Sequence, residues 1–188
     1  MSEPLIPSAL DVRHLALIRQ NVRDFMAEAA RRYADPAVPR RLLDIAPQIH
    51  EGARPFFPAA VAIDTLDLDP KSGCTYIADL CRTNRELIPG DHYDFVVCTE
   101  VLEHTLQPFH AVAEMRRVLK PGGLLFLTVP FNFRIHGPLP DCWRFTEHGL
   151  RSLLSDFDVV SLQGLETAER PLMPVHYTVA ARKPADRG

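Results

Sequence analysis

The stretch from Tyr93 to Pro130, YDFVVCTEVLEHTLQPFHAVAEMRRVLKPGGLLFLTVP, constrains the fold of this chain more than any other. Asp94–Cys98 is a short apolar run rich in β-branched residues, which predicts a strand buried on both faces. From Pro108 to Leu119 the apolar residues recur at helical spacing, and the Pro-Gly-Gly run at 121–123 is expected to end that helix. Leu124–Val129 predicts a second strand. Together these elements predict a βαβ unit in a parallel sheet.

The rest of the chain alternates between predicted helices and strands in the same way. Asp11 is a plausible N-cap for an amphipathic helix that continues to Tyr33. No repeat or linker interrupts the pattern, so we expect one domain over residues 1–188, with an N-terminal helix at 11–34 and an α/β core at 40–183. The further expected elements are strands at Arg41–Ala46, Ala59–Leu68, Cys74–Leu80, Asp158–Leu165 and Tyr177–Arg182, and a helix from a Thr146 cap to Phe157.

Composition and charge exclude several classes of protein. The 188 residues carry a net charge of −3 and include no long basic run, which argues against a nucleic-acid partner. No apolar run reaches 18 residues and the first residues do not resemble a secretory signal, so we expect a cytoplasmic protein without a membrane span. The four cysteines form no CxxC pair, which predicts reduced thiols and no metal site.

Acidic residues stand at the ends of three successive predicted strands. Asp44 ends the first, Asp64 and Asp67 compete for the end of the second, and Asp79 ends the third. Asp44 is interpreted either as a structural partner of the next turn or as a carboxylate that orients a ligand. Since ligands of open parallel sheets bind beyond the carboxyl ends of the strands, the series suggests a site for a ligand with a ribose diol, an amino group and an adenine.

With these features in view, the chain resembles the small class I S-adenosylmethionine-dependent methyltransferases. The segments that carry the resemblance are YDFVVCTEVLEH, RRVLKPGGLLFLTVP and PDCWRFTEHGLRSLL, and the similarity covers about residues 40–160. It implies a Rossmann-like three-layer sandwich with a mostly parallel seven-stranded sheet in the order 3-2-1-4-5-7-6, the last strand being antiparallel. It also implies S-adenosyl-L-methionine as the cofactor.

The resemblance assigns cofactor contacts position by position. Asp44 and Ala46 fall where the family holds the methionine end, and Asp67 falls where a carboxylate accepts both ribose hydroxyls, with Asp64 as the rival. Asp79 and Leu80 correspond to the adenine contacts. The position whose backbone holds the amino group matches Cys98 and Thr99, and His104 follows closely behind.

One segment departs from the family pattern. The usual D-x-G-x-G-x-G turn reads DIAPQIHEG here, with Ala46 and Gln48 in place of the first two glycines and His50 further along. Glycine at such positions permits positive φ and close approach of a ligand. The departure leaves open a second interpretation, in which the chain is a catalytically inactive subunit that acts as a scaffold or regulator of a partner enzyme.

The methyl acceptor leaves few traces in the sequence. His136 and His104 lie on loops at the carboxyl edge and are the candidate bases for an oxygen or nitrogen acceptor. Trp143 is interpreted as a packing residue or as a wall of the acceptor pocket. Because no large insertion is present, we expect a small or carrier-bound acceptor and a monomer or homodimer.

Overall fold

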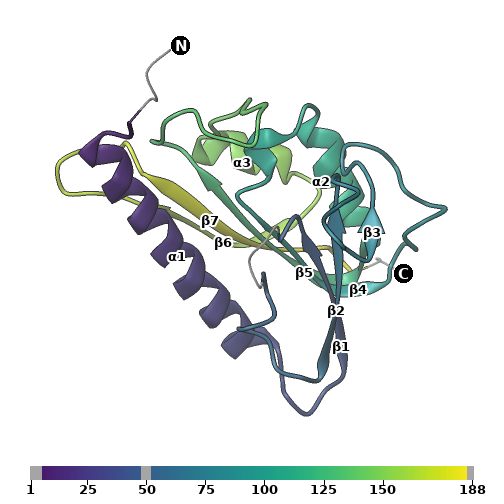
Figure 1. The fold of residues 1–188 in the computed structure, drawn as a ribbon. Coiled ribbons are helices and arrows are strands. Elements are labelled where there is room, and N and C mark those ends of the chain that lie inside the picture. Colours follow the sequence, from purple (N-terminus) through teal and green to yellow (C-terminus); the bar gives the residue numbers. More distant parts are fainter. Residues whose placement is uncertain (1–5, 48–51, 186–188) are drawn as a thin grey trace.

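The computed structural model describes residues 6–47 and 52–185, which form one seven-stranded sheet with helices on both faces (Figure 1). The strand order is β3-β2-β1-β4-β5-β7-β6. The elements in chain order are α1 (Ala9–Tyr33), β1 (Arg40–Ile45), β2 (Val61–Asp67), β3 (Tyr76–Ile77), β4 (Tyr93–Thr99), a short 3-10 turn (Leu102–His104), α2 (Pro108–Val118), β5 (Leu119–Pro130), α3 (Glu147–Leu153), β6 (Asp158–Leu165) and β7 (His176–Arg182).

The pairing within the sheet confirms the predicted topology. Strands β3, β2, β1, β4 and β5 are joined by parallel ladders, and β7 runs antiparallel to both β5 and β6. The βαβ unit predicted from the sequence is therefore β4, α2 and β5. Parallel pairing brings the carboxyl ends of β1 to β5 to the same edge, which is where ligands of such sheets bind.

Two apolar clusters hold the layers together. On one face, α1 packs Met26 and Ala29 against the aromatic side chains of Phe57, Phe95 and Phe126. On the other face, α2 and α3 cover buried residues of β4, β5 and β7. Figure 1 shows α1, in purple, on one side of the sheet and α2 and α3 on the other. The burial of both faces explains why β4 and β5 are almost continuously apolar.

Several element ends differ from the prediction: β3 is shortened to Tyr76–Ile77, and three of the differences concern helices. The N-cap of α1 is Ser8, because its hydroxyl accepts the N–H of Asp11 while the Asp11 carboxylate accepts the N–H of Ser8. Asp11 is therefore the third helical residue and not the cap. Helix α2 already ends at Val118, since Leu119 pairs with Tyr93, and the Pro-Gly-Gly run lies within β5.

The third difference concerns α3, which ends at Leu153 and not at Phe157. Its predicted cap is confirmed, since the Thr146 hydroxyl accepts the N–H of Gly149. In the described part of the chain, no helix is both long and apolar enough to cross a membrane.

Candidate functional site

An open crevice runs along the carboxyl edge of the sheet. Its walls come from the residues that follow β1, β2, β3 and β4 and from the loop at 138–140, and it continues along α2 to Gly90 and Asp91 before β4. The lining includes Ala46, Asp67, Asp79, Leu80, Glu100 and His104. Nine residues were assigned a cofactor contact or a base role from the sequence, and five of them line this crevice.

Asp44 lies beneath this crevice and not in its wall. Its side chain is 3% exposed, and Oδ2 accepts the backbone N–H of Ala53 at 2.7 Å. Burial raises the pKa of Asp44 to about 6, against the opposing effect of that hydrogen bond. A Cβ atom at Gly52 would lie 2.2 Å from the same oxygen. The carboxyl group therefore ties the end of β1 to the backbone at Ala53.

Ala46 shows how the chain leaves β1 where the family has glycine. Its φ is 50°, in the left-handed region that favours glycine, and its N–H donates to the carbonyl of Leu66 at 2.7 Å. Alanine thus reaches the backbone conformation that the resemblance requires, at the cost of local strain. Gln48 and His50, which raised the doubt about this turn, lie outside the described residues.

The rival carboxylates of β2 occupy different environments. Asp64 lies within the strand, where its Oδ2 contacts the Arg41 guanidinium at 2.8 Å and accepts the Tyr93 hydroxyl at 2.9 Å. Asp67 ends the strand and lies in the crevice wall, with Oδ1 accepting the N–H of Asp69 at 2.8 Å. Asp64 already has structural partners, so Asp67 is the carboxylate placed to meet a ligand.

Asp79 and Leu80 follow the short strand β3. The Asp79 carboxylate accepts the N–H of Cys81 at 2.8 Å and contacts the Arg82 guanidinium at 3.3 Å, while its side chain stays 38% exposed. Leu80 is nearly buried but still contributes to the crevice wall. The pair therefore offers one charged and one apolar group at the far end of the crevice from β4.

At the end of β4 the side chains of the predicted residues face away from the crevice lining. Cys98 is fully buried between β1 and β5, and burial raises the pKa of its thiol well above the usual value. Thr99 pairs with Thr128 of β5 and is partly buried. Any contact from Cys98 would have to be made by its backbone, as the resemblance implies.

From the sequence, Glu100 could face either the cofactor or the acceptor, and no specific role was assigned to it. It has a φ of 54° and lies in the crevice wall. Its Oε1 accepts the Thr128 hydroxyl at 2.9 Å and lies 2.6 Å from Nε2 of the fully buried His176. Nδ1 of His176 in turn lies 2.8 Å from the side-chain amide of Asn21 on α1. The available signal in the sequence was the position of this acidic residue directly after the apolar strand β4.

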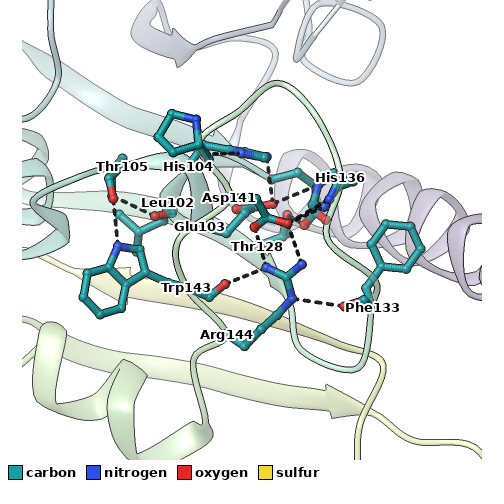
Figure 2. A network of polar contacts seen from close by, with 12 residues as sticks. Leu102, Glu103, His104, Thr105, Thr128, Phe133, His136, Asp141, Trp143 and Arg144 are labelled. Atoms are coloured by element: carbon teal, nitrogen blue, oxygen red, sulfur yellow. Dashed lines mark hydrogen bonds and ion pairs between the residues drawn. The ribbon is translucent and has the colours of Figure 1, made fainter. Parts of the chain in front are cut away.

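The two candidate bases, His104 and His136, lie side by side at the loop that follows β5 (Figure 2). The rings of His104 and His136 are 4.8 Å apart in an edge-to-face arrangement. Nδ1 of His104 lies 3.0 Å from the carbonyl oxygen of Pro140, and Nδ1 of His136 lies 3.1 Å from Oδ2 of Asp141. Only His104 of the pair belongs to the crevice wall.

Charged neighbours fix this cluster in place. Although burial opposes it, hydrogen bonds from Arg144 lower the pKa of Asp141 to about 2. Burial lowers the pKa of His136, against the opposite effect of Asp141, so this imidazole is neutral near pH 7. Arg144 also donates to the carbonyls of Phe133 and Arg134, which orders the loop after β5.

Glu103 lies beneath both histidines and is completely buried. Burial, and next the nearby charge of Glu100, raise the pKa of Glu103 well above its ordinary value. Its carboxyl oxygens have no hydrogen-bond partner among residues 6–47 and 52–185. In the sequence, Glu103 is only one polar residue of the loop that follows β4, because its burial depends on the distant segment at 136–144.

Trp143 packs onto Phe145 with the ring planes 21° apart, and its indole N–H donates to the carbonyl of Thr105 at 2.7 Å. It is 40% exposed. These contacts give Trp143 a packing role that links the loop after β5 to the polar loop after β4.

Comparison with known proteins gives a family and two curated relatives. The family model described as a methyltransferase domain matches residues 17–163. Demethylmenaquinone methyltransferase of Renibacterium salmoninarum is 31% identical over 127 residues, which cover 62% of this chain and 52% of that protein. Ubiquinone biosynthesis O-methyltransferase of Haemophilus ducreyi is 37% identical over 54 residues, 29% of this chain and 22% of that protein. The chain thus spans about half the length of the first relative and less of the second.

Solved structures extend the similarity in fold. The [4+2]-cyclase SpnF superposes with a TM-score of 0.67 and 18% identity, covering 88% of this chain and 80% of that one. Since that protein is described as a cyclase, the shared fold does not by itself decide the reaction.

Proposed function

The chain belongs to the methyltransferase-domain family, and from this premise we propose that it transfers a methyl group from S-adenosyl-L-methionine to an oxygen or nitrogen atom of a small or carrier-bound acceptor. The observation that carries the proposal is that Ala46, Asp67, Asp79 and Leu80 line one crevice at the carboxyl edge of the sheet. These are the positions at which the family resemblance predicts cofactor contacts. The names of the two curated relatives support a methyl acceptor of small-molecule origin.

The residues present fit the polar groups of this cofactor. Asp67 can accept hydrogen bonds from two adjacent ribose hydroxyls, because a carboxylate offers two acceptor oxygens side by side. Asp79 suits the exocyclic amine of adenine, and the apolar side chain of Leu80 suits its ring face. The left-handed Ala46 leaves the backbone after β1 accessible to the methionine end of the cofactor.

When bound, the cofactor supplies a methyl group on a sulfonium that is already activated as a leaving group. The chain's own task is then to align the acceptor and to exclude water, and orientation alone supplies about 7–11 kcal/mol in favourable systems. An oxygen acceptor also has to lose its proton. His104 in the crevice wall and His136 behind it are the groups proposed to act on that proton, through the unprotonated Nε2 of each ring.

Calorimetric titration with S-adenosyl-L-methionine and with S-adenosylhomocysteine tests this proposal. The wild-type chain is expected to bind both, and Asp67→Asn is expected to weaken binding about tenfold or more, since hydrogen bonds to a charged group contribute about 1.5–3 kcal/mol.

Asp158→Asn is the matched control, because it removes the same charge from an exposed position on β6, at the opposite edge of the sheet. Absence of binding at millimolar ligand would reject the proposal. Unchanged affinity in Asp67→Asn would move the ribose contact to Asp64 or Asp69. Binding without turnover across an acceptor screen would favour the inactive-subunit interpretation.

A further inference from the structure

Glu103 presents an energetic problem that the methyl-transfer site does not solve. Its side chain is 0% exposed, yet neither carboxyl oxygen has a hydrogen-bond partner in the described part of the chain. A buried carboxyl group without a hydrogen-bond partner is unfavourable whether or not it is ionised, so such groups are normally paired or coordinate a metal. We therefore expect a group near Glu103 that can interact with its carboxyl oxygens.

Two imidazole nitrogens converge on the same oxygen of Glu103 (Figure 2). Nε2 of His104 lies 3.7 Å from Oε1 of Glu103, and Nε2 of His136 lies 3.8 Å from it. These distances are too long for hydrogen bonds. They leave a space between three potential ligand atoms, all of which lie within 4.8 Å of one another.

The other nitrogen of each ring determines which atom is free to coordinate. The carbonyl of Pro140 can only accept, so Nδ1 of His104 carries the hydrogen and Nε2 keeps its lone pair. Nδ1 of His136 faces Asp141, whose carboxylate is held ionised by two hydrogen bonds from Arg144 at 2.6 and 2.7 Å. These two atoms lie 3.1 Å apart without hydrogen-bond geometry, so it is the nearby charge of Asp141 that favours a hydrogen on Nδ1 and leaves the Nε2 lone pair available toward Glu103.

We propose that Glu103 Oε1, His104 Nε2 and His136 Nε2 bind a divalent transition-metal ion of the zinc class. Ligand atoms about 2.0–2.1 Å from a tetrahedral zinc ion lie about 3.4 Å apart, so closing the site requires a movement of only some tenths of an ångström for the Glu103 contacts. Histidine ligands of metals generally donate their second nitrogen to a carbonyl or carboxylate, as His104 does to Pro140, and the second nitrogen of His136 lies 3.1 Å from the Asp141 carboxylate.

The three donor atoms narrow the choice of metal ion. Two imidazoles with one carboxylate suit zinc, iron, cobalt or nickel, whereas magnesium and calcium favour oxygen ligands. Three protein ligands leave at least one position open, as in catalytic zinc sites and unlike closed structural ones. The expectation that the chain has no metal site was based on the spacing of its cysteines, and no cysteine takes part in this ligand set.

The location suggests a role for the ion beside the methyl acceptor. This role rests on the proposed function, whereas the proposal that a metal binds does not. His104 is part of the crevice wall, so the open position lies next to the acceptor side. A hydroxyl bound to such an ion loses its proton more readily. The two histidines would then act on the acceptor through the metal, since one lone pair cannot hold both a metal and a proton.

Metal content after reconstitution tests the proposal without an activity assay. The purified chain is stripped with a chelator, incubated with zinc chloride, desalted and analysed by atomic emission, and zinc affinity is measured by calorimetric titration. We expect one zinc ion per chain with micromolar or tighter affinity. Glu103→Gln and His136→Asn are each expected to weaken binding at least a hundredfold, because each removes a direct ligand.

Two matched variants and one spectrum separate this site from adventitious binding. His148→Asn and Cys142→Ser change an exposed imidazole and an exposed thiol outside the proposed ligand set and are expected to keep full zinc content. X-ray absorption is expected to show nitrogen and oxygen ligands with imidazole scattering and no sulfur.

Three outcomes would overturn the proposal: no retained zinc in the wild-type chain, a sulfur ligand in the spectrum, or equal loss of zinc in Cys142→Ser. Circular dichroism verifies that the Glu103→Gln and His136→Asn variants are folded. Titration of the same samples with S-adenosylhomocysteine keeps a failure of the metal site distinct from a failure of the methyl-transfer proposal.

Discussion

At the scale of single residues, Asp44 links the stability of the fold to pH. The carboxyl is buried and its pKa is raised to about 6, compared with an ordinary value of 3.8. A raised pKa means that the folded state binds the proton more tightly than the unfolded chain does. The stabilisation that this carboxyl group contributes is therefore complete below about pH 4 and is lost as the pH rises through about 6.

Replacing Asp44 by Asn should remove this pH dependence. Asparagine keeps an oxygen that can accept the Ala53 N–H but does not ionise. Relative to Asp44→Asn, the wild-type free energy of unfolding should fall by about 3 kcal/mol between pH 4 and pH 7, since each pKa unit corresponds to about 1.4 kcal/mol. Urea unfolding of both proteins across this range measures the difference, and parallel curves would show that Asp44 does not titrate there.

The residue scale also shows what sequence could not reveal. The family resemblance favours Asp67 over Asp64, and the pairing of Asp64 with Arg41 and Tyr93 supplies a physical reason that the sequence does not show. Glu103 is one of several polar residues after β4 until the loop at 136–144 folds over it. In both cases the deciding contact comes from a residue distant in sequence, which no local pattern records.

At the scale of elements, Gly52 packs closely against the end of β1. Gly52 has a φ of 57°, and a Cβ there would meet Asp44 Oδ2 at 2.2 Å and Pro47 Cβ at 2.7 Å. Gly52→Ala should therefore lower the free energy of unfolding by about 2–4 kcal/mol, the sum of a left-handed alanine and an overpacked contact.

Gly73→Ala is the matched control for this prediction. Gly73 has a φ of 72° but no atom within 4 Å of a Cβ, so this variant carries the backbone cost alone. Its expected loss is about 1 kcal/mol. Equal losses in the two variants, measured by urea unfolding, would contradict the packing of this turn against Asp44.

Most elements were predictable because their signals are local. The apolar runs of β4 and β5 and the helical period of α2 are sufficient to place the βαβ unit, and Thr146 marks the start of α3. The errors lie at the ends of elements, where competing interactions decide. Leu119 leaves α2 because pairing with Tyr93 extends the sheet, and Ser8 replaces Asp11 as the cap because the two residues form a reciprocal capping box.

At the scale of the whole molecule, the topology determines what meets at the crevice. Parallel pairing of β1 to β5 brings Ala46, Asp67, Asp79 and Leu80 to one edge from segments far apart in the chain. The loop after β5 lines the other side with residues 138–140, and His136 lies behind that wall beside Asp141, which Arg144 holds. The strand order follows from the family resemblance, whereas the acceptor side depends on contacts specific to this loop.

The central claim is that the crevice at the carboxyl edge binds S-adenosyl-L-methionine, and a crystal structure with bound S-adenosylhomocysteine tests it most directly. The account predicts ribose hydroxyls within hydrogen-bond distance of the Asp67 carboxylate and the adenine against Asp79 and Leu80. Ligand density elsewhere on the chain, or a ribose held by Asp64 with Asp67 free, would contradict it.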